Sequence, residues 1–156
     1  MERDIWVAAP LDKAIGHILQ RYHETHRRQL AEIMPLAQKV AKVHESVFPQ
    51  DLMPVLTELS AELESHMMKE ERVLFPMALQ GMGQGAAMPV RMMMHEHDDH
   101  ADTLARLRAL TDDFTAPPHA CGSWQRLYAA LQELAEDLAE HIKLENEVVF
   151  PKILNH

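Results

Sequence analysis

Residues 131–151 read LQELAEDLAEHIKLENEVVFP, and residues 56–76 read LTELSAELESHMMKEERVLFP. Nine of the 21 aligned positions are identical, and the two copies begin 75 residues apart. Each copy contains the pattern His-x3-Glu, which on a helix places an imidazole and a carboxylate one turn apart on the same face. Two such faces turned toward each other would point nitrogen and oxygen ligands into a shared space. The repeat therefore predicts a metal site inside a helical bundle.

The residues around each motif place its histidine on an apolar helix face. Leucines stand three and seven residues before the histidine in both copies, namely Leu63 and Leu59 before His66, and Leu138 and Leu134 before His141. One more histidine precedes each copy at a matching distance. His23 lies 43 residues before His66, and His97 lies 44 residues before His141. A single His-x3-Glu pair is usually a hydrogen-bonded pair on a solvated face, but these shared features favour two buried half-sites.

Helical periodicity predicts four long helices joined by connections that contain proline or glycine. The expected helices run from Pro10 to Val43, from Asp51 to Pro76, over 87–110, and from Ser123 to Pro151. Pro35 lies inside the first helix as an expected kink, and Pro76 and Pro151 are expected to disrupt the second and fourth, because proline lacks the N–H that a helix uses. The pattern predicts an all-α, antiparallel four-helix bundle that forms a single domain over residues 1–156.

The composition excludes several other classes of protein. The chain has 156 residues, of which 47% are hydrophobic and 25% charged, as in an ordinary globular domain. Its net charge of -9 argues against binding to nucleic acid or to an anionic membrane surface. No apolar run reaches the length of a membrane-spanning helix, no secretory signal is visible, and a single cysteine excludes an internal disulfide. A cytoplasmic location is therefore expected.

The two half-sites together supply four imidazoles and two carboxylates. These candidate metal ligands are His23, His66, Glu70, His97, His141 and Glu145. If each of two metals takes two histidines and both glutamates bridge, each metal has four protein ligands. A bridging oxo or hydroxo group adds one more ligand, and one position per metal stays open for a small molecule. The absence of thiolate ligands favours iron or manganese over structural zinc, which prefers four closed ligands.

The remaining histidines give weaker signals. His26 and His100 lie three residues after candidate ligands and could orient them. His44 lies about six turns from His23 on a straight helix, and its role stays open. A ferritin-like carboxylate site, the structural alternative, uses Glu-x-x-His, and no histidine in this sequence has an acidic residue three positions before it.

Seven stretches of the sequence resemble a known group of proteins. They cover residues 21–30, 65–71, 75–77, 80–83, 96–98, 117–121 and 140–146, and the most specific is HMMKEE at 66–71. In these residues the chain resembles the hemerythrin-like di-iron proteins and, among them, the repair-of-iron-centres family of iron–sulfur cluster repair proteins. The resemblance implies two non-haem irons on the same six residues, with Glu70 and Glu145 as bridges.

The resemblance also implies a function. Members of that family repair iron–sulfur centres after nitrosative or oxidative stress, so the expected partners are damaged iron–sulfur proteins and nitric oxide or dioxygen. The expected chemistry is iron release, or binding and reduction of nitric oxide. The alternative is a carrier or sensor of oxygen or nitric oxide, but oxygen-carrying hemerythrins have His-x3-His on the third helix, where this chain has His97 and Ala101. Longer family members also carry an N-terminal cysteine-containing domain that this sequence does not include.

Overall fold

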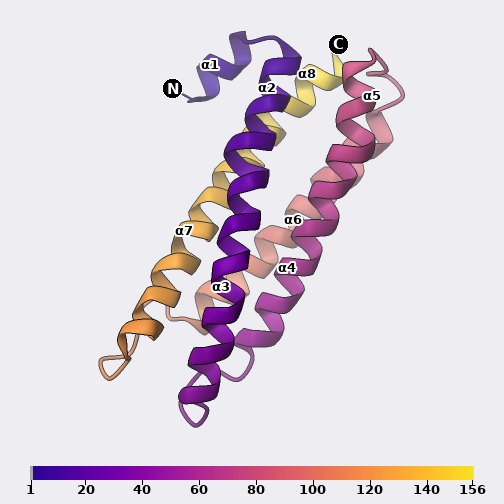
Figure 1. Cartoon of the computed structure of the whole chain (residues 1–156). Helices are drawn as coiled ribbons and strands as arrows, with labels where there is room; N and C mark the ends of the chain where they lie inside the picture. The colour runs from indigo at the N-terminus through magenta and orange to yellow at the C-terminus, as the bar shows by residue number, and fades with distance from the viewer. Residues whose placement is uncertain (1) are drawn as a thin grey trace.

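The computed structural model describes residues 2–156. In them, four helical rods form a bundle in which each rod runs antiparallel to the next along the chain (Figure 1). The first rod consists of α2 (Leu11–His17), η1 (Ile18–His23) and α3 (Glu24–Val43). The second consists of α4 (Leu52–Lys69), η2 (Glu70–Leu74) and α5 (Phe75–Leu79). The third is α6 (Ala87–Leu110), and the fourth consists of α7 (Gly122–Leu144), η3 (Glu145–Val149) and α8 (Phe150–Leu154). The predicted all-α antiparallel four-helix bundle is confirmed.

The ends of the rods follow the local sequence closely. Pro10 precedes α2 in an extended conformation, with φ -60° and ψ 151°, where its missing N–H leaves no helical bond unmade. Asp51 occupies the predicted N-cap position of α4, although its side chain makes no capping hydrogen bond. The third helix has the bounds that the periodicity predicts. A short helix, α1 (Glu2–Ala8), was not predicted and lies at the end of the bundle that also holds the C-terminus (Figure 1).

The expectation that Pro76 and Pro151 disrupt their helices is wrong. Each proline stands in the first turn of a short helix, α5 or α8, that continues its rod. A π-helical turn precedes each of these helices: Phe75 N–H donates to the carbonyl of Glu70, and Phe150 N–H donates to the carbonyl of Glu145. A proline in the first turn lacks only an N–H that the helix does not need there. Pro35, by contrast, lies inside a helix that continues past it to Val43, as the sequence predicted.

A buried polar layer divides the interior into two apolar clusters. The first cluster lies between α3, α4, α6 and α7 and includes Leu59, Leu63, Leu107 and Leu134. The second lies toward the termini and includes Ile18, Leu74, Val90 and Phe150. Along the rods, the buried histidines and glutamates lie where residues of the first cluster give way to residues of the second. The fold therefore collects the charged side chains at one level, between water-excluding layers.

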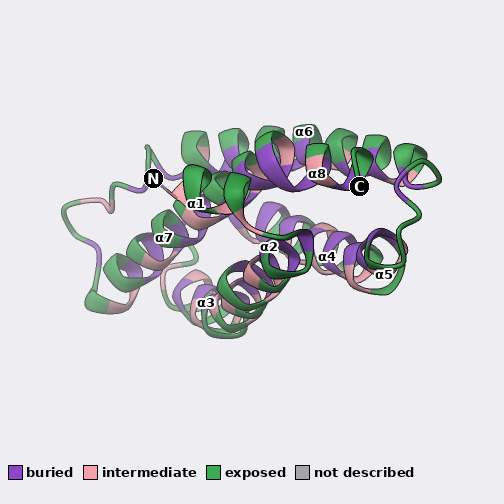
Figure 2. Ribbon diagram, turned by 90° about the horizontal axis from the view of Figure 1, so that it is seen from above, coloured by how far each residue is buried: buried purple, intermediate pink, exposed green. Residues whose placement is uncertain are grey.

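Packing of the rods brings this layer together. Helix α3 packs mainly on α7, and α4 mainly on α6. Seen from above, the buried faces of the helices turn inward and the exposed faces turn outward (Figure 2), as expected for amphipathic helices. Within residues 2–156, none of the helices combines the length and the apolar composition that crossing a membrane requires.

Candidate metal centre

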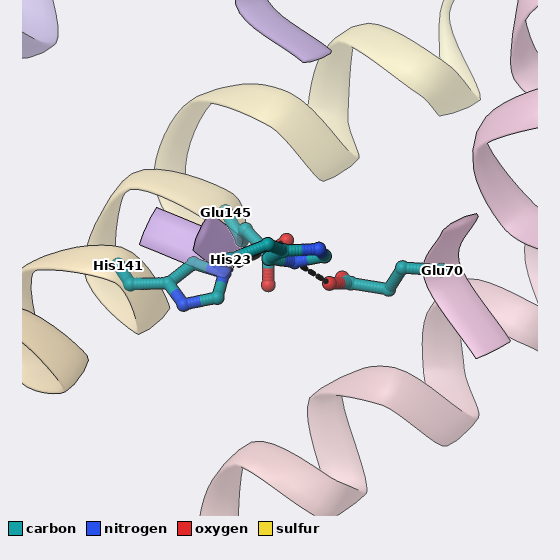
Figure 3. A group of neighbouring side chains, drawn as sticks. All are labelled: His23, Glu70, His141 and Glu145. Atoms are coloured by element: carbon teal, nitrogen blue, oxygen red, sulfur yellow. Dashed lines mark hydrogen bonds and ion pairs between the residues drawn. The ribbon is translucent and has the colours of Figure 1, made fainter. Parts of the chain in front are cut away.

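All six predicted metal ligands meet in the polar layer, where each is at most 2% exposed. Their ligand atoms form two overlapping groups, and the atoms within each group lie within 4.8 Å of one another. One group holds His23, His141, Glu70 and Glu145, and the other holds His66, His97, Glu70 and Glu145. Figure 3 shows the first group, whose side chains point toward one another from three rods. Each group thus takes one histidine from each half of the repeat and shares both glutamates.

The two glutamates occupy special positions in their helices. Glu70 is the first residue of η2 and Glu145 the first of η3, and His23 is the last residue of η1. The structure therefore places a π-helical turn at three of the six residues. A π-turn inserts an extra residue into the helix and is frequent at functional sites. It changes the direction of the following side chains while the rod continues.

The carboxylate of Glu145 spans the two groups. Its Oε1 lies 2.8 Å from Nε2 of His97, and its Oε2 lies 3.3 Å from Nε2 of His141. Glu70 Oε1 lies 3.0 Å from Nε2 of His23 and 3.6 Å from Nε2 of His66. Each glutamate therefore approaches one histidine of each group, which is the placement that a bridging carboxylate needs.

Several of these buried atoms have no hydrogen-bond partner among the described residues. They are Nε2 of His66, His97 and His141, Oε2 of Glu70, and both carboxylate oxygens of Glu145. The short distances to Glu145 are thus ion-pair distances without hydrogen-bond geometry. Burying an unpaired polar atom is costly, and clustering six of them at one point needs a reason. Nitrogen and oxygen donors aimed at a shared space fit bound metal, which would satisfy these atoms.

Opposite charges in the centre shift the pKa values of its groups. Burial would raise the pKa of the Glu145 carboxyl, but His141, His66 and His97 beside it hold that pKa well below its usual range. Burial would lower the pKa of His66, but the charges of Glu70 and Glu145 outweigh burial and raise it to about 11. Protons are therefore held where a metal could bind. Because a metal has to displace these protons, metal binding should weaken as the pH falls.

Two of the four histidines bind a residue that directly follows a shared glutamate. Nδ1 of His23 lies 2.7 Å from Oε2 of Glu71, and Nδ1 of His97 lies 2.8 Å from Oδ1 of Asn146. Glu71 and Asn146 occupy equivalent positions in the two copies of the repeat. Neither residue was predicted from the sequence, although their place directly after the glutamates was a usable signal.

The other two histidines are supported differently. Nδ1 of His66 lies 3.0 Å from Oε1 of Glu96, whose Oε2 accepts a hydrogen bond from Lys69 at 2.7 Å. Nδ1 of His141 lies 3.0 Å from Nε2 of His26, which is fully buried. All four histidines therefore turn Nδ1 to an outer polar partner and Nε2 to the shared space. That orientation is typical of metal-binding histidines, whose second nitrogen is held by a neighbour.

Three histidines outside the six candidate ligands, His26, His100 and His44, were also considered as possible parts of the centre. His26 contacts His141 as described, and His100 lies buried with its ring edge toward His66 at a centroid distance of 5.0 Å. Burial, together with the neighbouring His141 for His26 and His66 for His100, lowers the pKa of each to about 3. His44 lies at the far end of α3, where its Nε2 is 3.2 Å from Sγ of Cys121.

Replacing Glu71 or Glu96 with glutamine should weaken metal binding. The neutral amide no longer stabilises the Nδ1 proton of the histidine, so the opposite nitrogen becomes a poorer ligand, and we expect a loss of about tenfold or more in affinity. Competition with a chelator of known affinity measures the change. Glu64→Gln is the matched control, because Arg27 binds both Glu64 and Glu71 but only Glu71 contacts a histidine of the centre. An unchanged affinity in both test variants would contradict the role of these carboxylates.

Comparison with known protein families agrees with this arrangement of donors. The hemerythrin HHE cation binding domain matches residues 14–153 of the chain, which include all six candidate ligands. The chain belongs to the hemerythrin family. The cation-binding domain and the buried cluster of histidines and glutamates together identify this hemerythrin-family chain as a metal-binding protein.

Individual relatives carry a common name. The chain is 54% identical over 151 residues to the iron-sulfur cluster repair protein DnrN of Neisseria gonorrhoeae, a match that covers 97% of this chain and 96% of the relative. It is 48% identical to the iron-sulfur cluster repair protein YtfE of Musicola paradisiaca, over 96% of this chain and 68% of the relative. It is 49% identical to YtfE of Cronobacter sakazakii, over 99% of this chain and 70% of the relative. The resemblance predicted from the motifs is confirmed.

Proposed function

We propose that this hemerythrin-family protein is a di-iron protein that repairs iron–sulfur centres damaged by nitrosative or oxidative stress. One observation supports the metal centre above all others: four buried histidines present Nε2 to a space that two glutamates share. The relatives match nearly the whole chain, and their names support the repair function. Iron fits the donor set, since imidazole and carboxylate without thiolate suit it.

Each side chain has a specific part in the proposed centre. His23 and His141 would hold one iron, and His66 and His97 the other, with Glu70 and Glu145 shared between them. Four protein ligands per iron leave room for a small molecule such as nitric oxide or dioxygen, and the bound irons would supply sites that change oxidation state. The two carboxylates offset part of the positive charge, which makes burial of the centre tolerable.

The hydrogen bonds around the centre fix which nitrogen carries each proton. A histidine that offers Nε2 to a metal keeps its proton on Nδ1. His141 then donates from Nδ1 to Nε2 of His26, and His26 donates from Nδ1 to Oε1 of Gln29. Gln29 in turn donates from Nε2 to Oδ2 of Asp137 at 2.8 Å. The chain of bonds thus ends on a carboxylate and supports the ligand form of His141 at each step.

The residues of α6 support a carrier function less well than a repair function. Ala101 stands four residues after His97, at the position of the extra histidine in oxygen carriers, and it is exposed. His100 is the buried residue next to the centre on this helix, but it belongs to neither group of candidate ligands. The donor set therefore leaves both metals with four protein ligands, rather than closing one of them.

A repair assay tests the proposal. The reduced, iron-loaded protein is added to an iron–sulfur enzyme inactivated by nitric oxide, and recovery of that enzyme's activity is followed. We expect faster recovery than with the same amount of free ferrous iron, since the buried centre delivers or protects iron in a defined form. The Glu145→Leu variant, mixed with an equal amount of iron, serves as control and should give only the free-iron rate.

Ligand binding in parallel separates the two functions. Visible absorption spectra under nitric oxide and under dioxygen show whether each molecule binds and whether it is consumed. Consumption of nitric oxide or rescue of the damaged enzyme supports repair. A stable, reversible dioxygen adduct, with no turnover of nitric oxide and no rescue, would assign the protein to the carriers instead.

A further inference from the structure

A line of aromatic side chains runs from the candidate metal centre to the surface beside α1. Tyr22 stacks on His141 with a centroid distance of 5.0 Å and an interplanar angle of 9°. The rings of His17 and Tyr22 are nearly perpendicular, with a centroid distance of 5.8 Å. Trp6 of α1 stacks on His17 at 4.2 Å and is only partly buried. Four rings in sequence therefore connect a candidate ligand with the solvent.

The phenol in the middle of this line has its own proton acceptor. The Tyr22 hydroxyl donates to the carboxylate of Glu2, with distances of 3.1 Å to Oε1 and 3.2 Å to Oε2. Oε1 of Glu2 also lies 2.7 Å from Nε2 of His17. Tyr22 is only 1% exposed, so Glu2 rather than water receives its hydrogen bond. A buried phenol, a carboxylate and an imidazole thus form one connected network.

Packing alone explains part of this network, because the Glu2 contacts also attach α1 to the bundle. Packing does not require the hydroxyl, however, since phenylalanine would stack on His141 equally well. The second tyrosine of the chain offers a comparison. Tyr128 lies in the apolar cluster far from the centre, with its ring edge-on to Trp124 at 6.2 Å. Of the two tyrosines, only Tyr22 combines a ring contact with a candidate ligand and a hydrogen bond to a carboxylate.

We propose that Tyr22 is a redox-active residue that returns an electron to the metal centre when a peroxide has over-oxidised it. This proposal rests on the di-iron centre proposed above. Tyr22 gives one electron to the centre through the stacked ring of His141, and its O–H bond breaks as the proton passes to Glu2. The products are a neutral tyrosyl radical, a protonated Glu2 carboxyl and a centre reduced by one electron.

Trp6 completes the path to the solvent. The indole of Trp6 gives an electron across His17 to the Tyr22 radical and becomes a radical cation. Tyr22 takes its proton back from Glu2 and becomes a phenol again. An external one-electron reductant such as ascorbate then restores Trp6 at the surface. The line of rings would let the buried centre discharge an oxidising equivalent without damage to its own histidines.

Electron paramagnetic resonance tests the proposal directly. The protein is loaded with ferrous iron under anaerobic conditions, and its iron content is measured. It is then mixed with hydrogen peroxide and frozen rapidly, before the radical decays. We expect an organic radical whose spectrum narrows when the protein is made with ring-deuterated tyrosine. Tyr22→Phe should lose this signal, while the matched control Tyr128→Phe should keep it.

A further variant keeps Tyr22 and removes its proton acceptor. Glu2→Gln leaves the iron ligands and both tyrosines in place, and we expect a smaller yield of the radical at unchanged iron content. A signal that persists in Tyr22→Phe, or no tyrosyl signal from iron-loaded protein, would overturn the redox role while leaving the di-iron centre intact. A wild-type protein that binds no iron would instead refute the centre and this inference together.

Discussion

Replacing Glu145 with leucine should remove at least one of two irons from each protein chain. The carboxylate places one oxygen beside His97 and the other beside His141, so a leucine there takes a ligand from both groups at once. Leucine keeps the approximate size and the helix propensity of the site. Metal analysis of protein purified without chelator measures the loss directly, and the absorption of a bridged iron pair should disappear with it.

Glu70→Leu should have a similar effect, because Glu70 belongs to both groups as well. The control is Glu147→Leu, a change of the same kind two residues beyond Glu145 at a side chain that is 41% exposed and pairs with Arg3. That variant should keep both irons. If Glu70→Leu and Glu145→Leu also keep both irons and the native spectrum, these carboxylates orient other ligands and do not bridge.

Removing the metal should lower the melting temperature substantially. A ligand that binds only the folded state at 1,000 times its dissociation constant stabilises it by about 4 kcal/mol. For a chain of this length, 1 kcal/mol shifts the melting temperature by roughly 2–4 °C, so chelation should lower it by about 8–16 °C. The physical source is the cluster of buried donor atoms without hydrogen-bond partners, which a bound metal would satisfy. Calorimetry of the loaded and chelated forms measures the difference.

The same experiment has an internal control and a predicted pH dependence. The double variant with Glu70→Leu and Glu145→Leu should show almost no metal-induced shift. In wild-type protein the shift should shrink as the pH falls, because the cluster binds protons tightly and His66, whose pKa is raised to about 11, must lose its proton to bind metal. Equal melting temperatures with and without metal would argue against a buried metal centre.

Sequence patterns were sufficient to predict the four long rods and the candidate ligands, but not the short helix α1. The duplicated His-x3-Glu motif, the leucines before it and the matched upstream histidines identified six residues that the fold does bring together. Such local patterns are readable because a helix converts spacing along the chain into a face in space. The four-helix arrangement followed from the number of these faces and from the connections between them.

Helix propensity predicted the wrong outcome at the two prolines of the repeat. Pro76 and Pro151 were expected to disrupt their helices, because a proline inside a regular α-helix removes a hydrogen bond. The π-turns that begin at Glu70 and Glu145 shift the hydrogen bonds by one residue, and the helices then continue. Helix propensities describe regular α-helices, and they do not cover the rare π-turn inside a helix.

The sequence alone determined which residues could bind metal, whereas only the tertiary structure decided how they combine. His23 joins His141, and His66 joins His97, because α3 packs on α7 and α4 packs on α6. The partners Glu96 and His26 likewise reach their histidines across different rods. Contacts of this kind depend on how distant helices are rotated against each other, and no spacing within one helix specifies that rotation.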